Sequence, residues 1–595
     1  MSDVREILKE RPLLFDGGMG TYYKAKPGQE CEQANLLDPE GVLAVHGAYL
    51  EAGADAIKTN TFGLPRMAAA GNPLWEALTD EGWRLAAQAA AKTGAAVFAD
   101  LGPAPDTESL PAAQIYTALA ERFAALGAKN FLFETLSSDA GVAEAAWQIK
   151  EAVPDAFVLV SFAVLPDGYT REGLHCTQLV RSMTACGAVD AVGLNCVSAP
   201  GAMRTLVQQL GRTELPLSVM PNAGYPVVTR TRVQYQGKPE YFARELARLA
   251  AEGVRILGGC CGTTPAHIAA LRAALDALPE TLPAAPAAAV STAAKPEVEK
   301  DDAFLRKLNA GKKVIAIELD SPKDADLTGY LDGARRLQAA GADLLTIADC
   351  PIARARMDSS LVACRVHREL GLNVLPHMTC RDRNLNATKA LLLGLYAEGV
   401  REVLAITGDP IPTAERDEVK NVYQFNSRKL AQYIVSLAGE GREMPSPLTV
   451  FGALNLNARN FDVELRRAQE KLQNGMSGFL TQPVLSAQAV VNLKKTRETL
   501  GEKAKILAGI MPVVSQRNAV FMENEVNGIH VDAEIIERFA GLDRVQGEEL
   551  GLEVSVKAAQ AAAPYADGFY LMTPFNRIAL MERLIARLKD EGIAD

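Results

Sequence analysis

The stretch Val254-Arg255-Ile256-Leu257-Gly258-Gly259-Cys260-Cys261-Gly262 places two adjacent cysteines in a glycine-rich turn at the end of an apolar run. Glycine lets the backbone turn sharply there and leaves room for another group to approach. A third cysteine ends a second apolar run, Val192-Gly193-Leu194-Asn195-Cys196. Both runs are typical of strands, so we expect the three thiols at the ends of two strands.

Three cysteines at two strand ends can converge on one metal ion. Thiolates are soft ligands that suit zinc, and three protein ligands leave a fourth coordination position for a substrate. The alternative is buried free cysteine, which behaves as a small hydrophobic side chain. For Cys196 alone we prefer the packing interpretation, whereas Cys260 and Cys261, adjacent within a glycine cluster, favour a metal site.

Short apolar runs recur through the first half of the chain and alternate with alanine-rich segments of helical periodicity, such as 81–92 and 114–126. Strands that alternate with helices predict a parallel sheet, and eight such units predict a (β/α)₈ TIM barrel. The eight runs are residues 13–16, 56–61, 96–101, 130–134, 157–163, 191–196, 217–221 and 254–258.

The second half repeats this count, so the sequence predicts an α/β chain of two tandem TIM barrels. A longer insert between the seventh and eighth runs is expected to hold an extra helix. The fallback is a doubly wound sheet, but neither half carries a GxGxxG turn after its first strand. The runs are residues 314–319, 344–348, 374–378, 403–407, 448–454, 478–481, 506–510 and 568–572.

The composition changes between the two halves, over residues 278–300, LPETLPAAPAAAVSTAAKPEVEK. Proline and alanine dominate this stretch, and no large apolar residue recurs at helical or strand spacing, which predicts an extended, semi-rigid linker. We therefore predict a first domain over 1–282, a Pro/Ala-rich linker over 283–302 and a second domain over 303–595.

The length, composition and net charge of the chain restrict the class of protein. The chain has 595 residues, of which 48% are hydrophobic, and a formal net charge of −10; this charge argues against a nucleic-acid or anionic-membrane partner. No apolar run approaches the roughly 18 residues of a membrane span. Nine cysteines, an odd number, fit a reducing compartment rather than a disulfide framework, and the N-terminus has no signal pattern. We expect a cytoplasmic protein, and the sequence leaves open a homo-oligomer.

Polar and titratable residues gather where the fold would use them, at the carboxyl ends of the predicted strands. Exposure of strand ends to solvent explains many of them but not two adjacent cysteines. In the first half they are Asp16, Lys58, Asp100, Glu134, Asn195 and Cys196, and in the second Glu318, Thr346, His377, Thr407, Asp409, Asn455 and Gln482.

The first half resembles the homocysteine S-methyltransferases over about residues 10–280. The motifs that carry the resemblance are Asp16-Gly17-Gly18-Met19-Gly20-Thr21, Lys58-Thr59-Asn60-Thr61-Phe62, Phe133-Glu134-Thr135, Gly193-Leu194-Asn195-Cys196 and Gly258-Gly259-Cys260-Cys261-Gly262. The resemblance implies zinc held by Cys196, Cys260 and Cys261, with the homocysteine thiol as a further ligand. It also implies that Asp16 and Glu134 face the amino-acid end of homocysteine.

The chemistry of a thiol explains why a metal is needed. A free thiol has a pKa near 8.5 and the thiolate is the nucleophile, and coordination to zinc removes the proton at neutral pH. Carboxylates of Asp16 and Glu134 can pair with the substrate ammonium. For Asp16 a role in the Asp-Gly-Gly turn is about equally favoured by spacing alone, whereas Glu134 ends an apolar strand, where a carboxylate needs a partner.

The second half resembles methylenetetrahydrofolate reductase over about residues 303–590. Each matching piece is short, but together they follow successive predicted strands: Glu318, His377-Met378-Thr379-Cys380, Thr407-Gly408-Asp409-Pro410, Thr481-Gln482-Pro483 and Gly509-Ile510-Met511-Pro512. The resemblance implies FAD at the barrel mouth, reduced by NAD(P)H, which passes hydride to methylenetetrahydrofolate to give methyltetrahydrofolate. It implies FAD contacts from Thr346, His377, Glu464 and Lys471, a catalytic Asp409 near the flavin and pterin, and Gln482 near the folate.

Glu464 and Lys471 are seven residues apart and so share one helix face. The alternative for them is a solvated helix face, since Arg466, Arg467 and Glu470 belong to the same segment.

Two positions depart from the family pattern. We predict that Glu318 is the acid that donates a proton in folate reduction. It is followed by Leu319-Asp320-Ser321-Pro322 instead of Phe-Pro-Pro, which makes Asp320 a rival acid. Thr407 stands where many members carry arginine.

Together these features predict one enzyme that makes a methyl donor in its second half and forms methionine from homocysteine in its first. The direct methyl donor stays open between methyltetrahydrofolate, S-adenosylmethionine and S-methylmethionine. The alternatives are a methyltransferase fed by a sulfonium donor and fused to a reductase that acts separately, or one barrel that serves only as a regulatory ligand-binding module.

Overall fold

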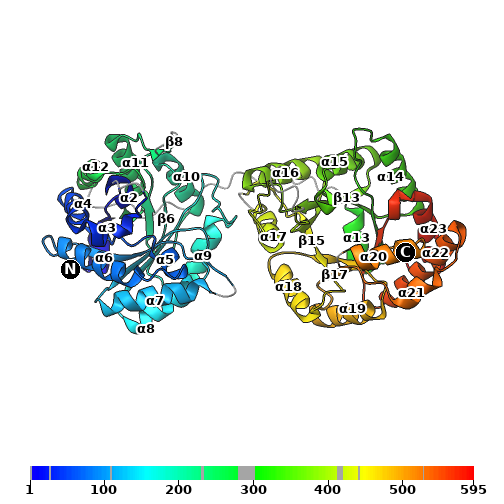
Figure 1. Cartoon of the computed structure of the whole chain (residues 1–595). Coiled ribbons are helices and arrows are strands. Elements are labelled where there is room, and N and C mark those ends of the chain that lie inside the picture. The colour runs from blue at the N-terminus through cyan, green and yellow to red at the C-terminus, as the bar shows by residue number, and fades with distance from the viewer. Residues whose placement is uncertain are drawn as a thin grey trace. The chain divides into compact units, whose positions relative to one another are not determined.

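The computed structural model describes residues 3–594 apart from 24, 26–27, 108–109, 229–232, 279–301, 412–419, 440–441 and 527. The chain divides into two compact units, Met1–Val290 and Ser291–Asp595, and in each of them helices surround a set of strands (Figure 1). The predicted linker lies outside the described residues except for its last residue, Asp302, so the domain boundaries stay a prediction.

The first unit is built on eight parallel strands in the order β1-β10-β7-β6-β5-β4-β3-β2. A parallel bridge between Phe15 and Ala56 joins the two ends of this order, so the sheet closes on itself. The strands are β1 (Leu13–Leu14), β2 (Ala56–Lys58), β3 (Ala96–Leu101), β4 (Asn130–Leu136), β5 (Phe157–Phe162), β6 (Ala191–Asn195), β7 (Leu217–Met220) and β10 (Ile256–Leu257).

Helices cover the outside of this barrel. They are α2 (Met19–Tyr23), η1 (Cys31–Gln33), α3 (Ala34–Leu37), α4 (Pro39–Glu51), α5 (Leu64–Ala69), α6 (Trp75–Ala90), α7 (Ala112–Ala125), α8 (Val142–Ala152), α9 (Cys176–Cys186), α10 (Pro200–Leu210), α11 (Pro239–Ala251) and α12 (Pro265–Asp276). A short antiparallel pair, β8 (Val227–Val228) and β9 (Val233–Gln234), lies in the segment after β7.

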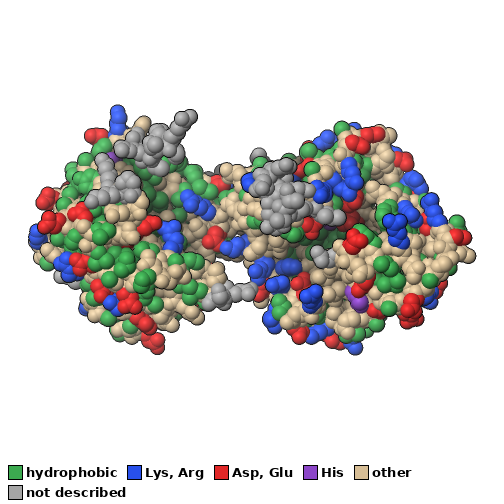
Figure 2. Space-filling view, in the orientation of Figure 1, with side chains coloured by type: hydrophobic (Ala, Val, Ile, Leu, Met, Phe, Trp, Pro, Cys, Tyr) green, Lys and Arg blue, Asp and Glu red, His purple; other side chains and the backbone are tan. Residues whose placement is uncertain are grey.

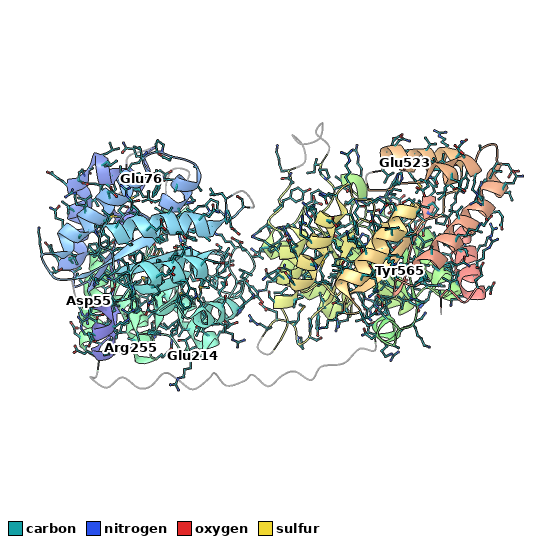
Figure 3. All side chains as sticks on the ribbon, turned by 90° about the horizontal axis from the view of Figure 1, so that it is seen from below. Asp55, Glu76, Glu214, Arg255, Glu523 and Tyr565 are labelled. Atoms are coloured by element: carbon teal, nitrogen blue, oxygen red, sulfur yellow. The ribbon has the colours of Figure 1, made fainter. Side chains whose placement is uncertain are left out.

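A helix that precedes the first strand closes the amino-terminal end of the barrel. In α1 (Val4–Glu10), Val4 belongs to the cluster of side chains that fills the barrel interior. The segment is tied down by Arg11, which pairs with Asp55 at 2.6 Å, and by Arg255, which donates to the Leu8 carbonyl at 2.5 Å. Asp55 and Arg255 are labelled in Figure 3. This end of the barrel is therefore occupied by structural contacts.

The second unit is a closed barrel of eight parallel strands in sequence order. The two tandem barrels predicted from the sequence are confirmed, and the doubly wound alternative is excluded because both sheets close. The strands are β11 (Val314–Glu318), β12 (Leu344–Ile347), β13 (Asn373–Thr379), β14 (Glu402–Ile406), β15 (Thr449–Leu454), β16 (Gly478–Pro483), β17 (Lys505–Ile510) and β18 (Gly568–Met572).

The helices of this unit include α13 (Ala303–Asn309), whose Phe304 and Leu308 belong to the interior cluster of the barrel. The insert between β17 and β18 holds two short helices, α20 and α21, before α22. The helical elements that follow α13 are α14 (Thr328–Ala340), η2 (Pro351–Ala353), α15 (Ser359–Leu370), α16 (Leu385–Glu398), α17 (Ser427–Ser436), α18 (Phe461–Gln473), α19 (Ala487–Leu500), α20 (Gln516–Glu525), α21 (Ala533–Arg538), α22 (Arg544–Ala562), η4 (Pro574–Asn576) and α23 (Ile578–Asp590).

The strand pleat explains how polar residues reach the mouth of the second barrel. The interior cluster takes at least one residue from each strand, among them Ala316, Leu344, Leu375 and Leu480. Side chains two residues further along a strand point to the same side. The next inward layer toward the carboxyl ends therefore contains, from these four strands, Glu318, Thr346, His377 and Gln482.

Acidic and basic side chains are interspersed over the visible face of each unit (Figure 2). Among the described residues, no helix combines the length and the apolar character that a membrane span requires.

Candidate functional site

The three cysteines singled out in the sequence lie together at the carboxyl ends of β6 and β10. Their sulfur atoms are all within 4.8 Å of one another, and Cys196 Sγ is 3.8 Å from Cys261 Sγ. The backbone holds them in place, because Cys196 N–H donates to Met220 O at 3.0 Å and Cys260 N–H donates to Pro221 O at 2.9 Å. We call Cys196, Cys260 and Cys261 the cysteine cluster.

The glycines around Cys260 and Cys261 are required by close contacts. A Cβ atom on Gly259 would lie 2.4 Å from Thr263 Oγ1, and one on Gly262 would lie 2.3 Å from Tyr235 Cβ. Gly262 also has φ +78°, a conformation that side chains disfavour. Tyr235 reaches further into the cluster, since its side chain hydrogen-bonds to Cys261. Sequence reasoning did not find Tyr235, which follows the short strand β9 and is not at the end of a barrel strand.

The spacing of the sulfur atoms fits zinc. With Zn–S bonds of about 2.3 Å in a tetrahedral site, two sulfur ligands stand about 3.8 Å apart. A disulfide would instead bring them to about 2.05 Å. The 3.8 Å between Cys196 and Cys261 therefore matches a pair of zinc ligands. Hydrogen bonds from the other two cysteines lower the pKa of Cys261, so the cluster favours a thiolate at this position.

A cavity of about 210 Å³ adjoins the cysteine cluster. Its lining includes Lys58, Asp100 and Glu134 from neighbouring strand ends, Glu32 from η1, and all three cysteines. Asp16 pairs with Lys58. Asp16, Lys58, Asp100 and Glu134 are between 2% and 7% exposed, so their charges have to be balanced within the protein.

Asp16 and Lys58 form an ion pair. Lys58 Nζ is 3.0 Å from Asp16 Oδ1, and the backbone N–H of Lys58 donates to Asp16 Oδ2 at 3.0 Å. Lys58 Nζ also lies 3.4 Å from Gly259 O, next to the first cysteine of the turn. Burial alone lowers the pKa of Lys58, but the carboxylates of Asp16 and Glu134 outweigh it and keep the ammonium charged. This lysine was placed at the strand end by the sequence but was given no role.

Asp100 and Glu134 form a pair of carboxyl groups. Burial raises the pKa of both, to about 7 for Glu134, and a hydrogen bond from Asp100 to Glu134 opposes the rise at Glu134. The pair therefore shares a proton, with Asp100 as its donor. Asn195 Nδ2 also donates to Glu134 at 3.3 Å and to Thr135 Oγ1 at 2.8 Å. Asn195 precedes Cys196, so the carboxyl pair is linked to the cysteine cluster through one residue of β6.

In the second barrel the predicted acid Glu318 is buried at the end of β11. The Tyr570 hydroxyl donates to Glu318 Oε2, and His377 Nε2 lies 4.0 Å from the same oxygen. Burial raises the pKa of Glu318 to about 7 and lowers that of His377 to about 4. His377 is therefore neutral near pH 7, and its Nε2 has no hydrogen-bond partner among the described residues. Thr346 pairs with Glu318 in the register of the sheet.

The rival acid Asp320 has a different environment. Its carboxylate lies 3.1 Å from Arg356 Nη2, and Arg356 also donates to Ser321 O at 3.0 Å. The Asp320 side chain is 35% exposed. Asp320 is therefore a partly exposed group in an ion pair, whereas Glu318 is buried at the barrel mouth.

Glu464 and Lys471 lie on α18 with side chains only 15% and 13% exposed, so the solvated-face alternative is excluded. Lys471 Nζ is 4.0 Å from Glu464 Oε1 and donates to Ala453 O at 2.7 Å. Glu464 Oε1 accepts from Asn455 N–H at 3.2 Å. Both side chains therefore reach the carboxyl end of β15, at the mouth of the barrel.

For Asp409 and Gln482 the structure shows no direct contact with Glu318 of the kind that Tyr570 makes. Asp409 is exposed on the loop after β14, and Gln482 is half-buried near the end of β16. The backbone carbonyl of Asp409 accepts from Arg381 at 3.2 Å and from the Tyr423 hydroxyl at 3.3 Å. The structure thus brings Glu318, Thr346 and His377 together, while Asp409 belongs to a loop held by an arginine.

An ionic network next to that loop was not predicted. Arg383 bridges Asp349, at 2.9 Å, and Asp358, at 2.6 Å. Asp349 Oδ2 also accepts from the backbone and the hydroxyl of Thr379. The two aspartates lie in the connection between β12 and α15, whereas Arg383 lies in the loop after β13, so the pairing cannot be read from sequence spacing.

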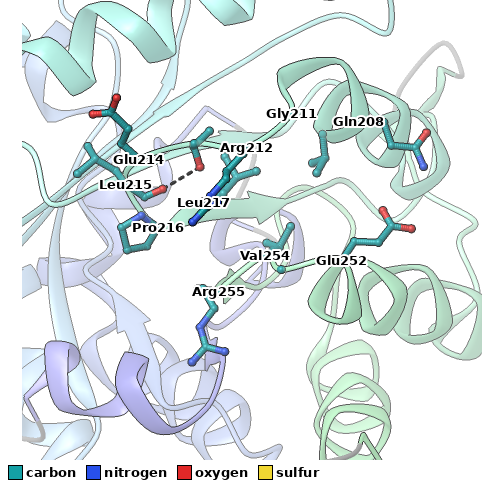
Figure 4. Close-up of a pocket in the computed structure, with 13 residues that line it drawn as sticks. Gln208, Gly211, Arg212, Glu214, Leu215, Pro216, Leu217, Glu252, Val254 and Arg255 are labelled. Carbon is teal, nitrogen blue, oxygen red and sulfur yellow. Dashed lines mark hydrogen bonds between the residues drawn. The ribbon is translucent and has the colours of Figure 1, made fainter. Parts of the chain in front are cut away.

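A second cavity, of about 270 Å³, lies at the opposite end of the first barrel, where β7 and β10 begin (Figure 4). Two of its charged groups already have structural partners: Glu252 pairs with Arg204 at 2.6 Å, and Arg255 donates to Leu8 O. The amino-terminal face of a TIM barrel usually serves stability, and this cavity contains no group of residues that would carry chemistry.

Comparison with known proteins identifies relatives of both halves. Residues 13–275 match the family model described as homocysteine S-methyltransferase, and residues 303–588 match the model described as methylenetetrahydrofolate reductase. The methionine synthase of Mycobacterium tuberculosis is 32% identical over 302 residues, which cover 46% of this chain and 25% of that protein. The methionine synthase of Mycobacterium leprae is 30% identical over 303 residues, with the same two shares.

The chain thus spans about a quarter of the length of these curated relatives. Among solved structures, a homocysteine methyltransferase of Escherichia coli in its metallated form covers 45% of this chain and 99% of its own length, with 25% identity and a TM-score of 0.38.

Proposed function

Residues 13–275 form a domain of the homocysteine S-methyltransferase family and residues 303–588 a domain of the methylenetetrahydrofolate reductase family, and we propose that the chain uses them to make methionine. In this proposal the second barrel reduces 5,10-methylenetetrahydrofolate to 5-methyltetrahydrofolate with FAD and NAD(P)H. The first barrel transfers a methyl group to the thiolate of homocysteine.

The observation that carries the proposal is the cysteine cluster beside a cavity with buried carboxyl groups. Cys196, Cys260 and Cys261 are the residues that would hold zinc. When bound, zinc supplies an open coordination position at which a substrate thiol loses its proton at neutral pH. The sulfur then attacks the methyl carbon, and the bond between that carbon and the donor breaks.

The protein's own groups would orient the substrate in the first barrel. Glu134 is the carboxyl group that we assign to the amino end of homocysteine, because it is buried, lines the cavity and is linked through Asn195 to Cys196. Asp16, the other residue expected there, already forms an ion pair with Lys58.

In the second barrel, five residues would contact FAD. They are Thr346 and His377 of the inward layer, Asp409 of the loop after β14, and Glu464 with Lys471 at the barrel mouth. The buried, unpartnered Nε2 of His377 fits a polar ligand. FAD supplies hydride transfer between the nicotinamide and the folate. Gln482 would contact the folate. Glu318, buried and hydrogen-bonded to Tyr570, is the group we assign as the acid that opens the imidazolidine ring.

The test uses the purified full chain. We expect about one zinc per chain, a visible flavin spectrum that bleaches on addition of NADH or NADPH, and formation of methionine from homocysteine. Methyltetrahydrofolate, S-adenosylmethionine and S-methylmethionine are supplied in separate reactions, since the donor is left open by the residues of the site. A protein without zinc, or one that forms no methionine with any of the three donors, would contradict the proposal for the first barrel; a colourless protein would contradict it for the second.

A further inference from the structure

The acid assigned to the second barrel is held by a hydroxyl group from the last strand. In the sheet register Tyr570 of β18 pairs with Ala316 of β11, two residues before Glu318. The tyrosine ring therefore has to extend about 7 Å toward the barrel mouth to reach the level of that carboxyl group. It does so, because the Tyr570 hydroxyl donates to Glu318 Oε2. Tyr570 is 6% exposed and belongs to the interior cluster, so packing fixes the direction of the ring.

The two oxygens of the Glu318 carboxyl group have different surroundings. Oε2 accepts from Tyr570, and His377 Nε2 lies 4.0 Å from it. No hydrogen bond from a described residue reaches Oε1, and the side chain keeps 24% of its surface exposed at the barrel mouth. A protonated carboxyl group has one hydroxyl oxygen and one carbonyl oxygen, and the carbonyl oxygen is the better acceptor. The contact with Tyr570 therefore leaves the proton on Oε1, the oxygen that a substrate can reach.

We propose that Tyr570 is a positioning residue for the acid: its hydroxyl directs the acidic proton to Glu318 Oε1 and stabilises the carboxylate that remains when this proton is given up. The inference rests on the proposed function of the second barrel. In the ring-opening step the proton passes from Oε1 to one ring nitrogen while the bond between this nitrogen and the bridging carbon breaks. The electron pair of that bond stays on the nitrogen, and the carbon is left as an iminium on the other ring nitrogen. The negative charge that appears on Glu318 is stabilised by the Tyr570 O–H group.

Tyr570 itself does not supply the proton. Burial raises the pKa of its hydroxyl well above the usual value, so the hydroxyl stays a donor over the range in which Glu318 titrates. Its hydrogen bond lowers the pKa of Glu318 against the larger effect of burial, which brings the value to about 7. A hydrogen bond to a charged group is worth about 10- to 100-fold, so loss of the hydroxyl should move the titration of Glu318 upward by about one to two pH units.

Removal of the tyrosine hydroxyl leaves the other polar and charged groups around Glu318 unchanged. Asp320, on the segment after β11, raises the pKa of Glu318, and it is paired with Arg356. Burial lowers the pKa of His377 on β13 to about 4, so this ring is neutral where Glu318 titrates. Thr346 of β12 lies beside the tyrosine hydroxyl and does not titrate. A shift in the titration of Glu318 can therefore be attributed to the lost hydrogen bond.

The experiment titrates Glu318 in the purified full chain by infrared difference spectroscopy. The band of its protonated carboxyl group is identified by its absence from Glu318→Gln protein. We expect a midpoint of about 7 in the wild type, and a midpoint about one to two pH units higher in Tyr570→Phe, which keeps the ring and removes only the hydroxyl.

Stopped-flow absorbance then follows the two half-reactions. Tyr570→Phe should reduce flavin with the nicotinamide nucleotide at the wild-type rate, because that step needs no acid. It should slow folate reduction about 10-fold at acidic pH, since the carboxylate left on Glu318 loses its partner. The fall in this rate with rising pH should be displaced upward by the same amount as the infrared midpoint.

Tyr330→Phe is the matched control. Tyr330 of α14 is also a buried tyrosine near Glu318, but its hydroxyl donates to the backbone carbonyl of Leu319 at 3.2 Å. This variant should keep the wild-type midpoint in the infrared titration. If Tyr570→Phe does not fold, Tyr570→Met, whose flexible side chain also fills the space without a hydroxyl, is measured with the same criteria.

The inference is overturned if Glu318 keeps the wild-type midpoint in Tyr570→Phe, or if Tyr330→Phe moves the midpoint as far. Folate reduction that continues at the wild-type rate in Glu318→Gln protein would instead contradict the proposed function. The infrared titration of the resting protein would then still measure the effect of Tyr570 on the carboxyl group, so the two failures are distinguishable.

Discussion

At the scale of single residues, the cysteine cluster decides the chemistry of the first barrel. Cys260→Ser replaces a thiolate ligand by a hydroxyl group that keeps its proton at neutral pH. Zinc affinity should fall by at least about a hundredfold, since changes outside the ligand shell alone cost up to that much, and methionine formation should be lost while flavin reduction continues. Metal analysis and the two assays measure this.

Cys186→Ser is the matched control for Cys260→Ser. Cys186 is also a half-buried free cysteine of the first unit, but it lies at the end of α9 outside the cysteine cluster. This variant should retain zinc and activity. Full zinc occupancy in Cys260→Ser protein would remove Cys260 from the ligand set.

Glu318 is the deciding residue of the second barrel. Glu318→Gln should keep the reduction of flavin by the nicotinamide nucleotide, which needs no acid, and should slow folate reduction by roughly a hundredfold to ten-thousandfold. Stopped-flow absorbance of the two half-reactions separates these steps. Asp320→Asn is the matched control, because Asp320 is held by Arg356 and is partly exposed. If Asp320→Asn stops the folate half-reaction and Glu318→Gln does not, the acid has been misassigned.

The raised pKa of Glu318, about 7, gives this residue a pH signature. The group holds its proton below that pH and loses it above, so the rate of folate reduction should fall as pH rises through about 7. The same shift affects stability: between an unfolded value near 4.5 and a folded value near 7, the folded state binds more protons, and the free energy of unfolding falls as pH rises through this window. Glu318→Gln should abolish both dependences, as rate profiles and thermal melts at several pH values would show.

At the scale of the elements, apolar runs separated by helical segments were enough to predict all sixteen strands of the two barrels, because buried parallel strands are nearly continuous apolar stretches. The ends of the strands were less predictable. β10 keeps only Ile256 and Leu257 of the run 254–258, since the backbone leaves the sheet early to form the glycine turn. The β8–β9 pair has no apolar alternation long enough to be recognised.

The candidate site was predictable in its residue types but not in its pairings. The strand-end rule located Asp16, Lys58, Asp100 and Glu134 at one rim, yet nothing in their spacing shows that Lys58 pairs with Asp16 and Asp100 with Glu134. Those pairings depend on side-chain directions across four strands. Tyr570 was likewise hidden, as an inward-facing residue of the last strand whose hydroxyl meets Glu318 from the first.

The glycine turn after β10 should determine how well the cysteine cluster binds zinc. Gly262→Ala should weaken zinc binding, because an added Cβ would lie 2.3 Å from Tyr235, whose side chain hydrogen-bonds to Cys261. Gly187→Ala is the matched control: its φ of +76° is close to the +78° of Gly262, but the nearest atom to the added Cβ is 3.7 Å away. Both variants should lose about 1 kcal/mol of unfolding free energy from backbone strain. Only Gly262→Ala should lower zinc affinity in a competition titration, and equal affinities would mean that the turn adjusts without moving the ligands.

At the scale of the whole molecule, each barrel has the parts of an independent folding unit. Each has its own closed sheet, its own interior cluster and its own amino-terminal helix beneath that cluster, α1 in the first and α13 in the second. The sequence between them is dominated by proline and alanine. Domains with separate cores fold alone as a rule.

We therefore predict that the two halves can be produced separately. A fragment of residues 1–282 should be soluble and bind zinc, because the three cysteines and the rest of that cavity's lining come from this half. A fragment of residues 303–595 should be yellow and reduce its flavin with NAD(P)H. Thermal melts should show each fragment unfolding within a few degrees of one of two transitions of the full chain. A full chain that melts in a single transition, with neither fragment obtainable in folded form, would mean that the two barrels depend on each other for stability and that the boundary between them is misplaced.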